Sequence, residues 1–289
     1  MPLSCAFFGA YPLSLAALKA LLVRDDVRVR TVFTLDPKAP KYAPFHNHVL
    51  DFLREQAPAI PVVLTAATAD IEAAFPSCCP AGVDLIVCCA YPFKIPASIL
   101  GRAQIEALNL HPSMLPRYRG ADPVRRVILN GETETGITLH RLVSRFDAGP
   151  IFAQRLVALF GNEDAGALSL RLSQEIPALL DEGLRHLRSG LAPQEQDESL
   201  ATFAPAVLDE ELHLSLDLDL QSLSRRIRAG WPFRPARFCT DYGTLSLAPP
   251  VVIENENHGN KSVRVEGERC FLELPEACIS ARIAALEKG

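Results

Sequence analysis

The residue types best suited to chemistry in this sequence lie in one short run, residues 109–120. The run contains the amide of Asn109, the imidazole of His111 and the hydroxyl of Ser113, and a carboxylate follows in a second loop at Asp147. An amide donates hydrogen bonds without titrating, and an imidazole ionises near neutral pH, where a nearby carboxylate can tune it. Such a set can bind a developing negative charge and move a proton. A polar run of this kind packs poorly, so we expect it to have a function.

Apolar stretches with alternating strand and helix patterns precede these polar residues. The alternation predicts an α/β, Rossmann-like fold, with a mostly parallel sheet and helices on both faces. Ligands bind such sheets beyond the carboxyl ends of the strands, where the run 109–120 and the segment 91–95 both fall. The expected strands are residues 4–9, 27–35, 61–64, 83–90, 108–111, 136–143 and 150–159, and the expected helices are 13–23, 47–56, 70–75, 122–129 and 165–188.

The last third of the chain has a different pattern. Residues 189–199 are rich in Gly, Pro and acidic residues and are predicted to be a linker. Short strand-like runs with turns between them follow, which favours a small β-barrel-like domain. We therefore expect one domain over residues 1–190, which carries the polar run, and a second over 200–289. The expected C-terminal elements are strands at 212–216, 236–240, 244–247, 251–253, 262–265 and 270–274, and a helix at 220–229.

The charge of the chain is distributed unevenly. The 289 residues carry a formal net charge of −5. Residues 191–289 contain ten Lys/Arg and sixteen Asp/Glu, a net charge of −6, which leaves about +1 for the remainder. An acidic C-terminal module is a poor partner for a phosphate backbone, so a nucleic-acid partner is not expected.

The cysteines and the N-terminus indicate the compartment. Eight cysteines are scattered without metal-ligand spacing, so we expect reduced thiols and no metal site. The apolar stretch 5–22 is broken by Gly9, Pro12 and Lys19 and lacks a basic leader. It therefore matches neither a signal peptide nor a membrane span. These features predict a cytoplasmic protein that does not associate with membranes.

Several short motifs follow one another between residues 109 and 149. They read Asn-x-His-x-Ser, Leu-Pro-x-Tyr-Arg-Gly, Gly-x-Thr-x-His and Asp-x-Gly. Their order and spacing resemble the formyltransferase family that uses 10-formyltetrahydrofolate, over a match that extends from the first strand to about residue 190. The resemblance implies an enzyme that transfers a formyl group to an amine. It also implies that Asn109 orients the formyl group and, with His111, stabilises the oxyanion, while Asp147 pairs with His111 and manages the amine proton.

The resemblance further implies a folate site between residues 89–95 and 142–147. Loop backbone would read the edge of the pterin while apolar side chains cover its faces. Tyr91 and Ile95 match the family, whereas Pro92 and Phe93 do not. The folate-binding candidates are Cys89, Tyr91, Phe93, Ile95, Leu142, Val143 and Ser113.

Two of the polar side chains have an alternative, purely structural interpretation. Ser113 could instead bond the backbone of its own loop. His140 lies on a buried strand near the site, and we expect it to be a hydrogen-bonded core histidine.

The acceptor amine is less clearly marked. Residues 36–47 are short and only mildly basic, unlike the basic loop of methionyl-tRNA formyltransferases, and residues 130–142 and 147–154 look closer to the UDP-amino-arabinose formyltransferase. We therefore favour a small amine, most specifically a nucleotide-linked amino sugar. Arg125 and Arg126 stand where those enzymes carry Asn-Trp; a guanidinium pair suits phosphate or carboxylate, and a solvated helix face is equally compatible. The acceptor-binding candidates are Arg119, Arg125 and Arg126.

Other functions stay open at this point. The acceptor could be methionyl-tRNA, an amino acid such as hydroxyornithine, or a carrier-tethered substrate. A folate-binding scaffold without catalysis is the non-enzymatic alternative. The sequence also leaves the oligomeric state open, a homodimer being one possibility.

Overall fold

The computed structural model describes residues 1–39, 47–240, 243–254, 261–275 and 277–287. Its internal contacts divide the chain into two compact units. Unit 1 comprises Met1–Arg119, Gly136–Val157 and Leu170–Phe203, and unit 2 comprises Gly120–Thr135, Ala158–Ser169 and Ala204–Gly289. The two units are therefore interleaved in the sequence, whereas the sequence pattern predicted a single boundary between residues 190 and 200.

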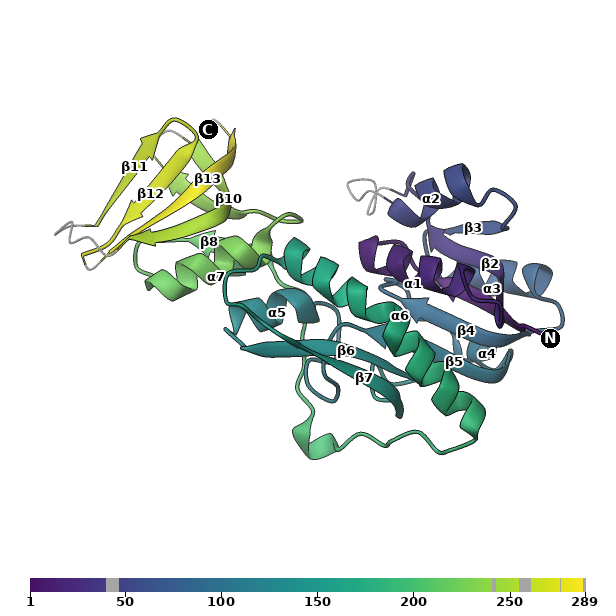
Figure 1. The fold of residues 1–289 in the computed structure, drawn as a ribbon. Helices are drawn as coiled ribbons and strands as arrows, with labels where there is room; N and C mark the ends of the chain where they lie inside the picture. Colours follow the sequence, from purple (N-terminus) through teal and green to yellow (C-terminus); the bar gives the residue numbers. More distant parts are fainter. Residues whose placement is uncertain (40–46, 241–242, 255–260, 276, 288–289) are drawn as a thin grey trace. The chain divides into compact units, whose positions relative to one another are not determined.

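Unit 1 is built on a seven-stranded sheet with the strand order β3-β2-β1-β4-β5-β6-β7. The pairs from β3 to β5 are parallel, and β6 runs antiparallel to β5. This confirms the predicted Rossmann-like, mostly parallel fold (Figure 1). The elements are β1 (Leu3–Phe8), α1 (Pro12–Leu22), β2 (Val27–Leu35), α2 (His48–Gln56), β3 (Val62–Thr65), α3 (Thr68–Cys78), β4 (Val83–Cys89), α4 (Ala97–Leu100), β5 (Ala103–His111), β6 (Glu134–Arg141), β7 (Ile151–Ala158), most of α6 (Ala165–Ser189) and η1 (Glu198–Leu200).

The strand order places the catalytic candidates at a familiar kind of site. The chain passes from β1 outward through β2 and β3, then returns to β4 on the other side of β1. Parallel sheets bind ligands at such a reversal, beyond the carboxyl ends of the strands. One expected strand boundary was wrong, since β5 begins at Ala103 and not at residue 108. The sequence pattern missed the first part of the strand because it has no apolar run and includes the exposed Ile105.

The core of unit 1 is aromatic beside the central strands. Phe8, Phe33 and Phe75 stack in series, with ring centroids 4.5 Å apart for Phe8–Phe33 and 5.7 Å for Phe33–Phe75. All three are fully buried, and each buried aromatic ring removes a large apolar area from water. At the end of β1, Gly9 permits close packing, because a Cβ there would lie 2.9 Å from the carbonyl oxygen of Cys89 on β4. The backbone therefore packs closely where β1 and β4 end.

Unit 2 contains a six-stranded sheet with the order β11-β12-β13-β10-β9-β8, in which only the β8–β9 pair is parallel. The predicted β-rich C-terminal region is confirmed. Helix α5 packs on α7, which brings residues 123–129 into this unit. Its elements are α5 (Pro123–Leu129), η2 (Asp209–Leu212), β8 (His213–Leu214), α7 (Leu220–Gly230), β9 (Ala236–Thr240), β10 (Gly243–Glu254), β11 (Ser262–Glu266), β12 (Arg269–Glu273) and β13 (Cys278–Glu287).

Two strand predictions in unit 2 were wrong. The runs 244–247 and 251–253 form one strand, β10, because its pairing with β13 resumes after an irregularity between Ala248 and Val252. Strand β13 was missed altogether; its second half, residues 282–287, is mostly exposed, so the apolar pattern is weak there.

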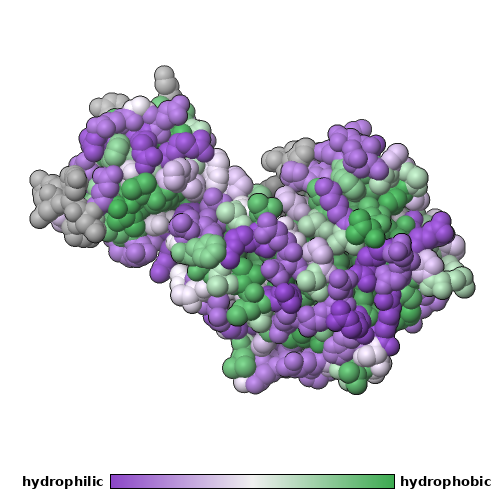
Figure 2. Space-filling view, in the orientation of Figure 1, coloured by the Kyte–Doolittle hydropathy of each residue, from purple (hydrophilic) through white to green (hydrophobic). Residues whose placement is uncertain are grey.

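The surface of unit 2 leaves several aliphatic side chains exposed on its strands. They are Val252, Ile253, Val265 and Leu286. Figure 2 shows hydrophobic areas on this unit between hydrophilic ones.

Within the part of the chain that the structure describes, no helix has the length and apolar character needed to cross a membrane.

Candidate active site

Strand β5 delivers the first two candidate residues. Asn109 and His111 are two positions apart, so a pleated strand places both side chains on the same face. His111 is the last residue of β5 and is buried, with 4% of its surface exposed. Both residues therefore stand at the carboxyl end of the strand.

The loop that follows β6 brings in Asp147. The loop is closed at its base, because the amide of Arg141 donates to the carbonyl of Pro150 at 2.8 Å. Gly149 allows the two strands of the loop to approach closely, since a Cβ there would lie only 2.0 Å from the carbonyl oxygen of Arg141. Asp147 itself has φ of 51°, a left-handed conformation that is uncommon for residues other than glycine. This turn directs its carboxylate towards β5.

The three side chains meet as a cluster. Asp147 Oδ1 lies 3.5 Å from His111 Nδ1 and accepts a hydrogen bond from Asn109 Nδ2 at 3.3 Å. The side chain of Asp147 is only 11% exposed. The structure thus brings together Asn109, His111 and Asp147, which the sequence separates by up to 38 positions. Across the described residues, no group of His, Cys, Asp or Glu is arranged to hold a metal ion.

The protonation of His111 follows from its neighbours. Its Nε2 lies 2.8 Å from the carbonyl oxygen of Tyr118, which can only accept, so Nε2 carries the hydrogen. In the neutral ring, Nδ1 therefore has a lone pair that faces Asp147. Burial lowers the pKa of His111 below its usual range, and the Asp147 carboxylate and the Tyr118 carbonyl oppose that shift. The ring is neutral at neutral pH and has an acceptor position ready for a proton.

His140 is the residue that the sequence reasoning undervalued. It was expected to be a core histidine, and it is indeed 1% exposed. However, the antiparallel register pairs it with Asn109, and its Nε2 lies 3.1 Å from Asn109 Nδ2 and 3.5 Å from Asp147 Oδ1. The carbonyl of Arg141 lies 2.9 Å from Nδ1, which therefore carries the hydrogen of the neutral ring. The only sequence signal was a polar residue in a buried strand.

Ser113 takes the structural role that was left open for it. Its Oγ donates to the carbonyl of Arg117 at 2.7 Å, and the side chain is fully buried. Thr138 Oγ1 donates to the carbonyl of Ser113 at 2.7 Å, and Gln154 Nε2 donates to Thr138 Oγ1 at 2.9 Å. These bonds hold the loop that follows β5 against β6.

An apolar surface lies beside the polar cluster, at the ends of β4 and β6. Tyr91, Phe93 and Leu142 are half-buried and pack on a core cluster that includes the buried Ile95. Tyr91 OH lies 2.6 Å from Thr65 Oγ1, and its ring meets the Phe93 ring edge-on at 5.5 Å. The structure therefore groups four of the residues that were predicted to bind folate.

The remaining folate-binding candidates differ from these four. Val143 is half-buried beside Leu142. Cys89 is fully buried, and its carbonyl oxygen accepts from Ser14 Oγ at 2.6 Å. Its side chain packs in the sheet, and burial raises the pKa of its thiol well above the usual range.

The arginines that were predicted to bind the acceptor have partners within the protein. Arg119 is 1% exposed; its guanidinium donates to Gln196 Oε1 at 2.7 and 3.0 Å and contacts Glu198. In unit 2, Arg125 pairs with Asp122. Arg126 donates to the carbonyls of residues 205 and 206 at 2.9 and 3.1 Å and pairs with Glu211. Arg119 and Arg126 thus bond the chain that follows α6, and Arg125 bonds Asp122 at the start of its own helix.

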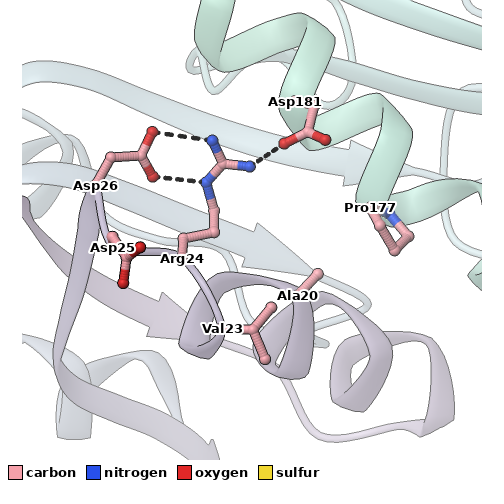
Figure 3. A pocket seen from close by; sticks show the side chains of 7 residues that line it. All are labelled: Ala20, Val23, Arg24, Asp25, Asp26, Pro177 and Asp181. Carbon is pink, nitrogen blue, oxygen red and sulfur yellow. Dashed lines mark hydrogen bonds and ion pairs between the residues drawn. The ribbon is translucent and has the colours of Figure 1, made fainter.

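A shallow pocket elsewhere in unit 1 is not a second candidate. It lies where α1 ends and β2 begins, against α6, which is the amino edge of the parallel sheet. Arg24 occupies it, held between Asp26 and Asp181 (Figure 3). The hydrogen bond from Arg24 lowers the pKa of Asp26 to about 2. The pocket is filled by an ion-pair network that ties the α1–β2 turn to α6.

Comparison with known proteins gives the chain a family. The formyl transferase family model matches residues 20–183. The chain is 31% identical to the methionyl-tRNA formyltransferase of Nitratidesulfovibrio vulgaris over 249 residues, which cover 82% of this chain and 72% of that protein. It is 37% identical to the methionyl-tRNA formyltransferase of Levilactobacillus brevis over 154 residues, 53% of this chain and 49% of that protein, so this match spans about half of the relative.

The fold is also shared with solved structures. An N-formyltransferase from Helicobacter canadensis, solved with folinic acid and dTDP-3-aminofucose, superposes with a TM-score of 0.69. The superposition covers 98% of this chain and 100% of that chain, at 16% identity. At this level of identity the likeness concerns the fold alone.

Proposed function

The chain belongs to the formyl transferase family, and on that premise we propose that it transfers a formyl group from 10-formyltetrahydrofolate to a primary amine. The observation that carries the proposal is the cluster at the carboxyl end of β5. There the carboxylate of Asp147 lies 3.3 Å from the amide of Asn109 and 3.5 Å from the imidazole of His111. Acyl transfer to an amine requires a donor for an oxyanion and a group that accepts and returns a proton.

The apolar surface beside the cluster suits a folate. The donor, when bound, supplies an electrophilic formyl carbon whose oxygen becomes negatively charged as the amine attacks. Tyr91, Phe93 and Leu142 offer apolar cover for a flat ring, and they adjoin a strand that pairs with β5 beside Asn109. Pockets of this kind, with apolar walls and a few convergent polar groups, bind small ligands. The residues present therefore fit the cosubstrate that the family implies.

The geometry supports a specific division of work among the three side chains. Asn109 Nδ2 donates to the formyl oxygen in place of its long, 3.3 Å hydrogen bond to Asp147 Oδ1, while its second hydrogen stays with His140 Nε2. An amide makes such a donation without changing charge. His111 Nδ1 accepts the proton that the attacking amine loses, since Nε2–H is committed to the Tyr118 carbonyl. Asp147, 3.5 Å away, stabilises the imidazolium that results. The same proton is then returned to the nitrogen that leaves the formyl carbon.

This division differs in two respects from what the family resemblance implied. The amine proton goes to His111 here, and it was Asp147 that managed it in the family's arrangement. There, His111 shared the stabilisation of the oxyanion with Asn109. The orientation of the ring instead supports a role as a proton acceptor, because its one hydrogen points to a backbone carbonyl at 2.8 Å.

Two acceptors deserve testing first. Methionyl-tRNA is supported by the relatives at 31–37% identity, which are named methionyl-tRNA formyltransferases, and this support is stronger than that for the amino sugar favoured by the sequence pattern. A nucleotide-linked amino sugar is supported by charge, because residues 191–289 carry a net charge of −6. Proteins bind the phosphate backbone of a nucleic acid with Lys and Arg, so an acidic region does not favour tRNA. The short loop 36–47, used in the same argument, lies largely outside the described residues.

The proposal is tested with a panel of amines. The protein is incubated with 10-formyltetrahydrofolate and, in separate reactions, methionyl-tRNA, a nucleotide-linked amino sugar and hydroxyornithine, and products are examined by mass spectrometry. We expect a formyl mass gain on one of them, and none with the Asp147→Asn variant. A protein that is stabilised by reduced folate but formylates no amine would be a folate-binding scaffold, and the proposal would fail.

A further inference from the structure

We propose that Gln196 is a positioning residue for Asp147 in the proposed formyl transfer, and that residues 194–203, here called the strap, hold the two loops of the active site from outside it. The sequence pattern predicted a linker over most of this stretch. In the structure the strap runs back along unit 1 after α6 (Figure 1). It begins with a two-way backbone pairing between Gln194 and Ile151, at 2.7 and 2.9 Å. It is therefore an ordered element of unit 1.

The side chain of Gln196 joins the loop of Asp147 to a buried charge. Its Nε2 donates to the carbonyl of Asp147 at 2.8 Å and to the carbonyl of Gly149 at 2.7 Å. Its Oε1 accepts from Arg119 Nε at 3.0 Å and Nη2 at 2.7 Å. One amide thus uses both donors on the Asp147 loop and its acceptor on Arg119. The Arg119 guanidinium has only donors, so the end of the Gln196 amide that faces it must be the oxygen. The NH2 group of Gln196 therefore faces the Asp147 loop.

The strap also holds the other side of the cluster. Thr202 Oγ1 accepts from the amide of Tyr118 at 2.9 Å, and the carbonyl of Thr202 accepts from the amide of Arg119 at 2.9 Å. Tyr118 is the residue whose carbonyl receives Nε2–H of His111. The strap therefore bonds both loops on which the His111–Asp147 pair depends.

The backbone conformations explain why such support is needed. Tyr118 and Asp147 have φ of 60° and 51°, in the left-handed region. A residue other than glycine in this region is strained and keeps that conformation only when its surroundings hold it there. The strap bonds both residues, through Thr202 and Gln196 respectively. In the turn of Asp147 a backbone rotation would swing the carboxylate away from His111 Nδ1, so Gln196 acts on the reaction through Asp147.

The chain offers variants that separate the two ends of the Gln196 side chain. Gln196→Ala removes both ends. Gln196→Glu keeps an acceptor for Arg119 but replaces the donors with an oxygen that repels the carbonyls of Asp147 and Gly149. Gln194→Ala is the matched control, because Gln194 is exposed and bonds Ile151 through its backbone. All three are made in the full-length chain.

The first measurement is made without folate or acceptor. Because the Asp147 carboxylate raises the pKa of His111, withdrawal of that carboxylate should lower the pH at which His111 titrates in NMR spectra. We expect this shift in Gln196→Ala and Gln196→Glu and not in Gln194→Ala. A His111 titration that is unchanged in both Gln196 variants would overturn the inference, even if the protein proved to have no formyltransferase activity.

The second measurement is the turnover of the proposed reaction at saturating substrates. Misplacement of a reacting group by about 1 Å can reduce a rate by about 100-fold, so we expect a 10- to 100-fold loss in both Gln196 variants, with folate KM changed little. If Gln196→Glu kept full turnover while Gln196→Ala lost it, Gln196 would serve only to hold Arg119, and the assignment would be wrong. Melting temperatures distinguish this loss from unfolding.

Discussion

Asn109 Nδ2 and His140 Nε2 lie 3.1 Å apart across the antiparallel β5–β6 pair. Because Nδ1 of His140 is committed as a donor to the carbonyl of Arg141, Nε2 of the neutral ring accepts from Asn109. The contact decides which way the Asn109 amide faces, since it assigns the NH2 group to the side of His140 and Asp147. The donor proposed for the formyl oxygen is therefore oriented by a residue outside the Asn109–His111–Asp147 set.

This relationship predicts a difference between two substitutions at His140. His140→Gln can place an acceptor near Asn109, whereas His140→Leu removes it and leaves a half-buried donor without this partner. We expect turnover to fall about 10- to 100-fold in His140→Leu and to be largely retained in His140→Gln. Steady-state kinetics give the turnover of each variant, and melting curves show whether each variant is folded. Equal losses in the two variants would mean that His140 matters only for packing.

Removal of the proposed proton-transfer pair should abolish chemistry and spare the fold. His111→Ala and Asp147→Asn are each expected to lower turnover by about 100- to 10,000-fold, the usual contribution of a positioned acid or base. His111 ends β5 and Asp147 lies in the loop between β6 and β7 rather than in the central core, so melting temperatures should change little. Folate binding, followed by calorimetry, is the control. Near-normal turnover in either variant would refute the proposed roles.

The titration of His111 should lie below the ordinary histidine value of about 6.5, because burial dominates its shift. Asp147→Asn should lower it further, since the carboxylate opposes the effect of burial. The measurement is a pH series of NMR spectra, with His111→Gln to assign the signal. A His111 pKa that rose in Asp147→Asn would contradict the charge relationship.

The same shift has a consequence for stability. The folded-state pKa lies below the unfolded one, so above about pH 6.5 both states are neutral at this position and the group has no effect. As the pH falls below 6.5, the unfolded state binds the proton first, and stability is lost until the folded-state pKa is passed. We expect His111→Gln to lose less stability than the wild type over that interval, measured by urea unfolding at several pH values.

Arg126 is expected to contribute to stability rather than to acceptor affinity. If it bound an anionic acceptor, as the sequence pattern favoured, Arg126→Trp would raise the acceptor KM. The structure instead commits the guanidinium to the carbonyls of Pro205 and Ala206 and to Glu211. We therefore expect Arg126→Ala to lower the free energy of unfolding by about 1–3 kcal/mol with little change in KM. A large KM effect at unchanged stability would restore the binding role.

Gly149 should not tolerate a side chain. A Cβ at this position would lie 2.0 Å from the carbonyl oxygen of Arg141, a backbone atom that cannot move independently. Gly149→Ala should therefore destabilise the protein by about 1–3 kcal/mol or displace the Asp147 loop. Gly101→Ala is the matched control, because its Cβ would lie 3.4 Å from the nearest atom, an ordinary contact. Equal stability of the two variants would argue against the close approach.

Local sequence patterns were sufficient for much of the fold. Apolar runs predicted β1 and β4, because strands buried on both faces need apolar side chains at nearly every position. Asn109 and His111 were recognised since they share a face of β5 and follow its apolar part. The boundary of β5 and the whole of β13 were missed where strands carry exposed residues, which leave no clear periodicity.

The partners of polar side chains were decided only by the tertiary structure. His140 lies 31 positions from Asn109, and Gln196 lies 77 positions from Arg119 and 49 from Asp147. Nothing in a local pattern specifies a β5–β6 register or the path of a strap, because both depend on how distant segments pack. For the same reason the sequence offered Arg119, Arg125 and Arg126 as ligand candidates without showing their partners. In the structure Arg119 and Arg126 bond segments that follow α6, and Arg125 bonds Asp122 at the start of its own helix. The sequence by itself determined which groups were available for chemistry, and long-range packing determined which of them meet.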